Sequence, residues 1–217
     1  MKKLVLIILI LSLPALSIAG LRLGLTGAVN LSKIETSLPF WKNYSNYKLG
    51  YGFGLSSEIP LSDRFFFSPS ILYMKTGAKF DNTLFNPNLP PTELTLHYLS
   101  LTPKLGVKFL KVFRLEFGPR VNYLTSAKEI YSMVNSSSQI LKFEDDITDQ
   151  FKRFDFTLTG GVSVHVLHFL SVALYYNHGL TDINKNQTYS TDNSPDSFIS
   201  FTEYNRSFTL ALTYYLW

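Results

Sequence analysis

Residues 114–123 read RLEFGPRVNY and alternate between polar and apolar side chains with a period of two. The odd positions carry Leu, Phe, Pro, Val and Tyr, whereas the even positions carry Arg, Glu, Gly, Arg and Asn. In a β-strand this period sends the two sets of side chains to opposite faces. The mixed face of small and charged residues suits the tapering interior of a narrow barrel, and the oily face suits lipid.

Seven further segments are read as strands in the same way. They are residues 21–31, 51–59, 65–76, 99–109, 154–166, 170–177 and 207–216. The facing of 65–76 stays open, because this segment is apolar on both faces and contains Pro69. We predict an all-β fold, an eight-stranded antiparallel up-and-down transmembrane β-barrel. A soluble barrel or sandwich is the alternative, but its polar face would carry more Lys, Glu and Thr and fewer glycines.

The connections between these segments alternate in length. Three are short, at residues 60–64, 111–113 and 167–169, and four are long and polar, at residues 32–46, 77–93, 125–151 and 180–203. In bacterial outer-membrane barrels the short turns face the periplasm and the long loops face outward. The alternation therefore predicts an outer-membrane location and gives the orientation of the barrel.

The composition excludes several other classes of protein. With 46% hydrophobic and 17% charged residues the chain is too apolar for a disordered protein. It has no long Lys/Arg-rich tract, so we expect no nucleic-acid partner. It has no cysteine, which excludes disulfides, thiolate metal sites and a cysteine nucleophile.

The N-terminal segment has the features of a secretory signal. Lys2 and Lys3 precede a mostly apolar run at residues 4–13, and residues 17–19 read SIA, with small residues where signal peptidase cleaves. We predict a cleaved signal peptide at residues 1–19 and an outer-membrane β-barrel domain at residues 20–217. The alternative is a retained N-terminal anchor, for which the apolar run is short.

Several short motifs, in their order along the strands, carry a family resemblance. They are residues 24–32 ending in NLS, PSILY at 69–73 followed by KTG at 75–77, YLSLTPKL at 98–105, GPR at 118–120 and NRSF at 205–208. With these motifs the mature chain resembles the porin-family or PorT-like outer-membrane β-barrel proteins of Bacteroidetes-type bacteria. The resemblance implies an eight-stranded barrel and says little about activity.

The C-terminus departs from the pattern of such barrels. They usually end on an aromatic residue in phase with the lipid-facing side chains, whereas here Leu216 is in phase and Trp217 is one step beyond. We expect the barrel-assembly machinery to recognise Tyr215 and Trp217, or to tolerate Tyr214 instead.

The predicted inner face carries a network of charged residues. Its members are Arg22, Glu58, Lys104, Lys108, Arg114, Glu116, Arg120, Asp155 and His165. With a turn at 111–113, Glu116 lies opposite Lys108 and bridges it to Arg114, and Lys104 faces Arg120. Charges in so narrow a space must be paired or hydrated. The network is therefore a structural salt-bridge plug or, alternatively, a gate or anion site at Lys104 and Arg120.

The sequence contains no recognisable catalytic motif. There is no His-Glu-x-x-His metal motif and no nucleophile elbow. Asp155 and His165 share the inner face of one strand but lie about 33 Å apart at the usual rise, which excludes a triad. We expect no catalytic residues, no metal and no cofactor. The acidic residues Glu144, Asp145, Asp146 and Asp149 form a possible loop contact for a divalent cation, or simply a solvated loop.

These observations favour a non-enzymatic outer-membrane barrel with a structural or surface-interaction role through its long loops. The expected partners are outer-membrane lipid, the barrel-assembly machinery and an extracellular or envelope ligand of unknown identity, and the protein is expected to be a monomer. The main alternative is a narrow channel for small solutes. A soluble periplasmic lipid-binding barrel, with the oily face inward, is a third reading.

Overall fold

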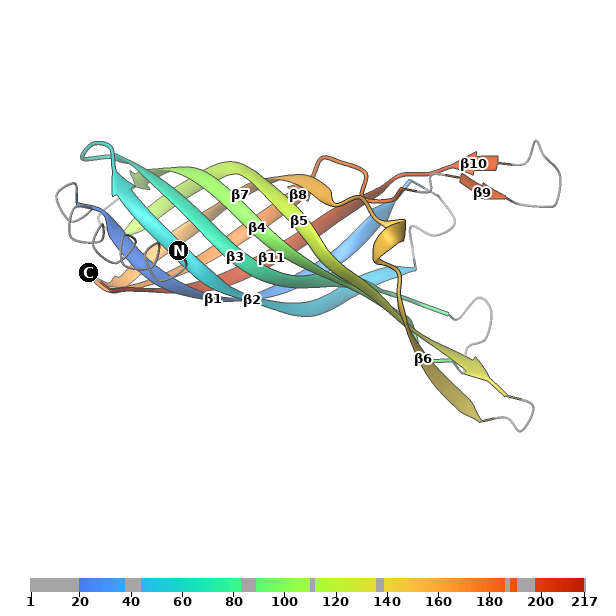
Figure 1. Ribbon diagram of the computed structural model, residues 1–217. Coiled ribbons are helices and arrows are strands. Elements are labelled where there is room, and N and C mark those ends of the chain that lie inside the picture. The colour runs from blue at the N-terminus through green and yellow to red at the C-terminus, as the bar shows by residue number, and fades with distance from the viewer. Residues whose placement is uncertain are drawn as a thin grey trace, which may run out of the picture.

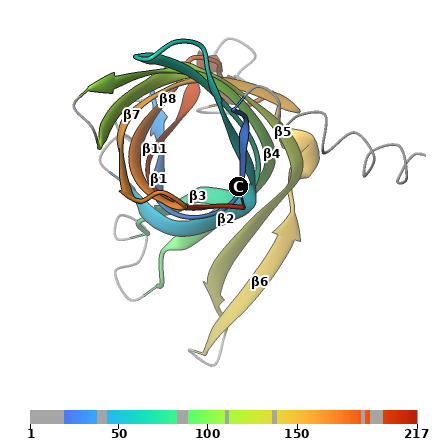
Figure 2. The ribbon, with the colours of Figure 1, turned by 90° about the vertical axis from the view of Figure 1, so that its left-hand side faces the viewer.

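The computed structural model describes residues 20–37, 44–82, 89–109, 112–135, 139–185, 188–190 and 198–216. The predicted signal segment 1–19 and Trp217 lie outside these residues. Eight long antiparallel strands of the described chain close into a barrel, which Figure 2 shows end-on. They are β1 (Arg22–Thr36), β2 (Ser45–Pro60), β3 (Phe65–Phe80), β4 (Thr92–Phe109), β5 (Phe113–Val134), β7 (Phe154–Leu167), β8 (Leu170–Gly179) and β11 (Glu203–Tyr215).

The topology is the predicted up-and-down meander. Each of these strands pairs with the next one along the chain, and β1 pairs with β11 to close the ring. The start of β1, the end of β11 and the short turns lie at one end of the barrel (Figure 1). The predicted eight-stranded up-and-down barrel is confirmed. Among the described residues no helix is long and apolar enough to cross a membrane.

The predicted division of the chain into strands and long loops was wrong at the loops. Much of the length of these predicted loops forms strand. β1, β3 and β5 continue to Thr36, Phe80 and Val134, and β6 (Ile140–Asp146) pairs with the outer part of β5. β9 (Thr188–Ser190) and β10 (Phe198–Ser200) form a second, two-stranded sheet. In these extensions the strict alternation of oily and polar residues fades, although the backbone ladder continues.

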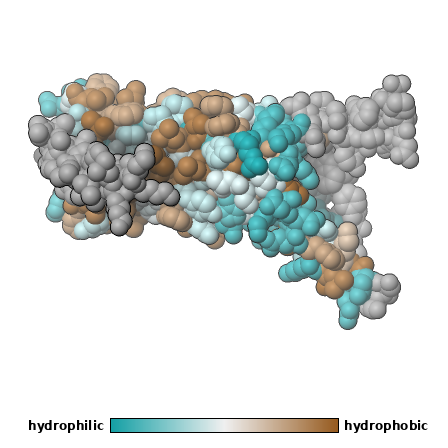
Figure 3. All heavy atoms as spheres, in the orientation of Figure 1, coloured by the Kyte–Doolittle hydropathy of each residue, from teal (hydrophilic) through white to brown (hydrophobic). Residues whose placement is uncertain are grey.

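The oily face lies on the outside of the barrel. Leu105 and Phe117 expose 62% and 60% of their surface, and most lipid-facing positions of the other strands are exposed in the same way. On the face shown in Figure 3, apolar side chains cover the barrel wall and hydrophilic ones gather toward the outer rim. This arrangement excludes the alternative with the oily face inward.

Strand β3, whose facing the sequence left open, turns its even-numbered residues inward. Phe66, Leu72 and Met74 are buried in the lumen, whereas Phe65 and Ile71 are exposed on the outer face. The inner aromatic ring is accommodated by a glycine, because a Cβ added at Gly106 would clash with the ring of Phe66. The register of β3 with β2 and β4 determines which of its side chains point into the lumen, because the polarity of β3 itself does not distinguish its two faces.

Three prolines lie side by side across the wall of the barrel. Pro69 pairs with Pro103 between β3 and β4. The β4–β5 ladder has no bridge between Leu101↔Val121 and Leu105↔Phe117, and this gap places Pro103 level with Pro119. Proline has no N–H to donate, so it is normally confined to edge strands or bulges.

The Pro103 carbonyl oxygen points toward β5, because a Cβ added at Gly118 would clash with it. Its ladder partner would be the backbone nitrogen of residue 119, which in proline carries no hydrogen. An unpaired carbonyl group within the lipid-covered wall costs several kcal/mol. The β4–β5 seam is therefore a weak point of the barrel.

Replacing Pro119 should stabilise the barrel. Pro119→Val supplies an N–H to the Pro103 carbonyl, and we expect a net gain of about 1–2 kcal/mol after the greater freedom of the unfolded chain is subtracted. The measurement is the urea midpoint of unfolding in detergent micelles. Pro119→Ala restores the same N–H with a smaller side chain and serves as the matched variant. Unchanged or lowered midpoints in both would show that the seam is not limited by this hydrogen bond.

Candidate functional site

The end of the lumen beside the short turns, which is predicted to face the periplasm, holds a charged cluster around Glu58. The Glu58 carboxylate contacts Arg114 Nη1 at 3.2 Å, His165 Nε2 at 3.5 Å and Arg22 Nη1 at 3.9 Å. The guanidinium of Arg114 also hydrogen-bonds to His165. The ring of Tyr215 stacks on His165 with centroids 5.4 Å apart. One carboxylate is therefore shared by three basic groups, so the side chains fix one another in place.

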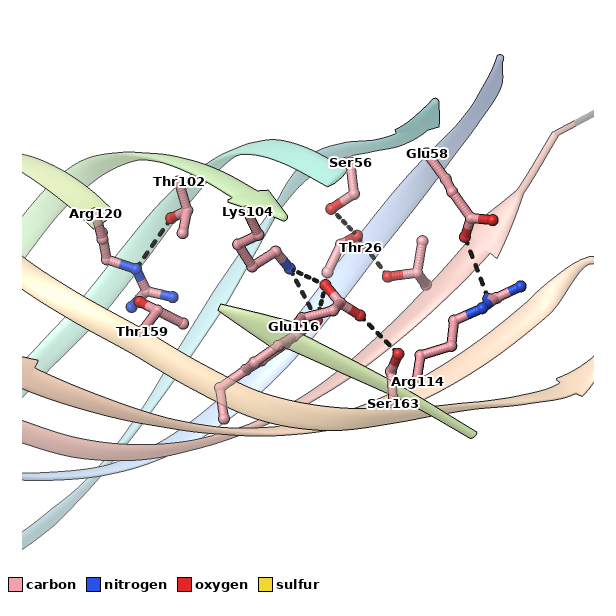
Figure 4. Close-up of polar contacts among 12 residues, drawn as sticks. Thr26, Ser56, Glu58, Thr102, Lys104, Arg114, Glu116, Arg120, Thr159 and Ser163 are labelled. Carbon is pink, nitrogen blue, oxygen red and sulfur yellow. Dashed lines mark hydrogen bonds and ion pairs between the residues drawn. The ribbon is translucent and has the colours of Figure 1, made fainter. Parts of the chain in front are cut away.

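A second cluster fills the middle of the lumen (Figure 4). Lys104 Nζ lies 2.9 Å from Glu116 Oε2 and donates to the Tyr175 hydroxyl at 2.8 Å. The Tyr175 hydroxyl donates to Glu116 Oε2 at 2.9 Å, and the Ser163 hydroxyl donates to Glu116 Oε1 at 2.6 Å. The Lys104 and Glu116 side chains are only 7% and 5% exposed. Both charges are paired and hydrogen-bonded, as burial requires.

The predicted partners within the network were wrong by two positions. The β4–β5 hairpin closes at Phe109↔Phe113, so Glu116 lies opposite Gly106 and Lys108 lies opposite Arg114. Glu116 therefore pairs with Lys104 instead of bridging Lys108 and Arg114. Arg120 is not face to face with Lys104 and instead donates from Nε to the Thr102 hydroxyl at 3.0 Å. A turn centred one residue earlier shifts every pair by two.

Arg120 and Asp155 lie further toward the outer end and have mostly neutral partners. Asp155 is fully buried and accepts hydrogen bonds from Asn122, Thr181 and Asn205 at 3.1, 3.0 and 2.9 Å. Two cavities of about 20 Å³ each lie beside these residues, and each has room for about one water molecule. Lys108 is half-buried and forms no ion pair within the described part of the chain.

An apolar plug, which the sequence did not predict, closes the outer end of the lumen. The plug consists of the buried residues Ile34, Met74, Ala78, Leu94, Leu96, Leu124, Ala127, Phe151 and Ile183. Phe151 and Ile183 belong to predicted loops that fold back over the barrel mouth. Lys152 N donates to the Ile183 carbonyl at 2.8 Å, and Lys185 N donates to the Gln150 carbonyl at 2.9 Å. The sequence signal that could have indicated this plug is the presence of single apolar residues, Phe151 and Ile183, within polar predicted loops.

Carboxylates hold these folded-back segments to β11. The Glu203 backbone N–H donates to Asp182 Oδ1 at 2.9 Å, and Asn184 Nδ2 donates to Glu203 Oε2 at 3.3 Å. Lys152 Nζ lies 3.0 Å from Asp182 Oδ2. Burial, assisted by the Asp182 charge, raises the pKa of Glu203 to about 7. The Glu203 side chain is thus partly protonated at neutral pH.

The four acidic loop residues do not converge on one point. Glu144 pairs with Lys128 at 2.6 Å and Asp149 with Arg153 at 3.4 Å. Tyr131 donates to Asp145, and the Thr148 N–H donates to Asp146. Across the described ranges, no group of three or more His, Cys, Asp or Glu residues is arranged to hold a metal. The structure thus gives the predicted cation contact no common site.

The two tyrosines considered for the predicted insertion signal, Tyr214 and Tyr215, lie on opposite faces of the barrel wall. Tyr215 faces the lumen and is buried, while its neighbour Tyr214 is exposed on the outer face. Trp217 lies outside the described residues. Recognition of these residues by the assembly machinery stays a prediction.

The closed antiparallel barrel, its oily exterior and its filled, charged lumen define a membrane-embedded β-barrel of the outer-membrane type. The model of the family described as "Outer membrane protein beta-barrel domain" matches residues 14–185. The chain therefore belongs to this family of outer-membrane proteins. No curated protein matches the sequence.

Several solved structures are similar to this chain at low sequence identity. Neisserial surface protein A (NspA) is 10% identical with a TM-score of 0.48, and the match covers 88% of this chain and 96% of that one. Ail, the attachment invasion locus protein of Yersinia pestis, is 11% identical with a TM-score of 0.45, covering 90% and 98%. OprG from Pseudomonas aeruginosa is 12% identical with a TM-score of 0.43, covering 91% and 96%.

The central ion pair should respond strongly to the loss of one partner. Lys104→Met leaves the Glu116 charge buried without its cation, and we expect a loss of about 3–5 kcal/mol in the free energy of unfolding. Glu116→Gln should have a comparable effect, whereas the double variant should recover most of the loss. Urea unfolding in detergent measures all three.

The exposed pair Lys128–Glu144 provides the matched control. It joins the same residue types across two strands, but water covers both groups. Lys128→Met and Glu144→Gln should each leave the urea midpoint close to that of the wild type, because water screens the exposed pair. Equal losses at the buried and exposed pairs would contradict the structural role assigned to Lys104 and Glu116.

Proposed function

We propose that this protein is a non-enzymatic, non-conducting outer-membrane barrel that binds a protein partner outside the cell. The observation that carries the proposal is the contrast between the two ends of the molecule. Among the described residues, side chains block the lumen at three levels. The ribbon formed by β5 and β6 projects beyond the barrel rim (Figure 1). Apolar side chains of this ribbon are exposed.

The filled lumen argues against the channel alternative. A solute would have to pass the Glu58 cluster, the Lys104–Glu116 pair and the apolar plug in sequence. The polar cavities between them are large enough for single water molecules only. An eight-stranded barrel has room for side chains or one small ligand, and here side chains take that room.

The β5–β6 ribbon has the character of a binding surface. Near its end five apolar side chains are 41–54% exposed, namely Met133, Val134, Ile140, Leu141 and Phe143. Tyr131 stacks on Phe143 with ring centroids 5.6 Å apart, which stiffens the ribbon. Figure 3 shows this apolar group on the ribbon, separated by hydrophilic side chains from the apolar belt, which is the apolar part of the barrel wall. An apolar patch outside the lipid that is bordered by polar residues is typical of protein-binding sites.

The edge of β6 offers a second kind of contact. Within the described chain β6 pairs with β5 alone, so one row of its backbone N–H and C=O groups faces outward. A partner strand can add to such an edge through main-chain hydrogen bonds. We therefore infer that the partner is a protein with an apolar surface and an extended segment.

Other features belong to the same proposal. The secretory signal at residues 1–19 would direct export, and the assembly machinery would insert residues 20–217 as a monomer into outer-membrane lipid. The motif order supports a PorT-like, porin-family origin within the wider family. The absence of a catalytic motif in the sequence supports a non-enzymatic role.

Conductance in planar bilayers distinguishes a closed barrel from a channel. We expect no unitary currents from the wild-type protein, and none from Lys104→Ala/Arg120→Ala, because the apolar plug is intact in that variant. Phe151→Ala/Ile183→Ala should also stay silent, because the Lys104–Glu116 layer still blocks the lumen. Steady unitary currents from the wild type that change in the Lys104/Arg120 variant would establish a channel instead.

Photo-crosslinking in cells tests the ribbon directly. A photoreactive residue at position 141 should give a discrete protein adduct, whereas one at the lipid-facing position 55 should not. Met133→Ser/Ile140→Ser/Phe143→Ser should remove the adduct while leaving the heat-dependent gel shift of the folded barrel unchanged. The same adduct from both positions, or no adduct from position 141, would contradict the proposal.

A further inference from the structure

A polar groove lies on the outer wall of the barrel where β3, β4 and β5 leave the apolar belt. Its volume is about 450 Å³, and its lining includes Lys75, His97, Ser126, Lys128 and Glu144. These residues are separate from the lumen and from the exposed end of the ribbon. The groove has no role in the function proposed above.

The register places the groove at the upper border of the lipid-covered wall. Phe53, Tyr73, Leu99 and Tyr123 form a continuous row across four neighbouring strands. The next row outward is Tyr51, Lys75, His97 and Ser126. From one row to the next, the side chains on the outer surface of β3, β4 and β5 thus change from aromatic and aliphatic to basic and hydroxyl-bearing. Aromatic residues of this kind mark the level of the lipid headgroups.

The groove presents cations to that level. Lys75 Nζ lies 5.7 Å above the ring centroid of Tyr51 and takes no part in the ion pairs found among the described residues. Lys128 reaches the groove from β5 and is paired with Glu144 at 2.6 Å. Just beyond the groove Lys48 and Lys79 share the single carboxylate of Glu93, at 3.1 and 3.2 Å. Lysines therefore outnumber carboxylates around the groove.

Neutral donors complete the lining. The Tyr73 hydroxyl and His97 Nδ1 hydrogen-bond to each other, and the Thr125 hydroxyl donates to the His97 carbonyl at 2.9 Å. These bonds hold the floor of the groove in place, and Ser126 adds a further hydroxyl group. The ammonium groups of Lys75 and Lys128 and the hydroxyl group of Ser126 form a suitable set of donors for phosphate oxygens.

We propose that this groove binds the phosphate of a phosphorylated lipid headgroup in the outer leaflet, with the acyl chains lying on the aromatic row below. Lys75 would contact the phosphate directly. Lys128 would contact it by exchanging its bond to Glu144. The ligand class follows from the position of the groove, since a headgroup phosphate is held at this level by its own acyl chains.

Lipid retention measured by native mass spectrometry in detergent tests the proposal with lipid A as the probe. The intact protein should retain lipid A, and the same lipid after removal of its phosphates should be retained about tenfold less. Lys75→Gln should weaken retention about tenfold, as expected for the loss of one charge-assisted hydrogen bond. Glu144→Gln should strengthen it, because Lys128 is then released.

Lys33→Gln is the matched control. Lys33 also lies near the outer rim and stands over a tyrosine, with Nζ 5.4 Å from the Tyr47 ring centroid, but it does not line the groove. Its loss should leave lipid A retention unchanged. Equal effects of Lys33→Gln and Lys75→Gln, or equal retention of the dephosphorylated lipid, would overturn the proposal. Displacement of lipid A by millimolar inorganic phosphate would assign the groove to free phosphate instead.

Discussion

The hydrogen-bonding requirement of a backbone in lipid governs this structure. No water within the bilayer can satisfy a peptide group, so every strand must be paired on both sides and the sheet must close on itself. Closure by the β1–β11 pairing meets this requirement and imposes one inner and one outer face on every strand. The prolines of the β4–β5 seam matter for the same reason. A missing N–H that a soluble sheet edge tolerates becomes a local defect here.

Closure with eight strands also determines what the lumen contains. The ring is too narrow for a hydrated passage once side chains occupy it, so charged residues on the inner face have to neutralise one another. Glu58 does this with Arg22 and Arg114, and Glu116 does it with Lys104, while Ser163 and Tyr175 donate hydrogen bonds to the Glu116 carboxylate. These contacts tie β1, β2, β4, β5, β7 and β8 together across the barrel. The side chains of the interior therefore stabilise the barrel by linking its strands, and the candidate functional surfaces lie outside the lumen.

The sequence predicted the strands and, for all of them but β3, their faces, because the lipid imposes a strict period of two, which RLEFGPRVNY displays without exception. Prediction from the sequence failed for the β4–β5 register, the plug and the strand extensions, because the period of two carries no information about them. The β4–β5 register depends on one turn residue, since Phe109↔Phe113 and a pair one residue further on both preserve the faces. The plug residues Phe151 and Ile183 stand alone in polar segments, so no periodicity marks them. The strand extensions beyond the rim face water, where oily residues are no longer required.

The same requirement explains why the outer end carries the candidate binding surfaces. Within the lipid all strand edges are paired and all charges are turned inward, which leaves little for a partner to recognise. Above the apolar wall both constraints end, so β5 continues with β6 as a two-stranded ribbon, and within the described chain the outer edge of β6 has no partner strand. A two-stranded ribbon is marginally stable in water on its own. Its apolar side chains gain little from burial within the ribbon, and contact with a partner would cover them and pair the free edge at once.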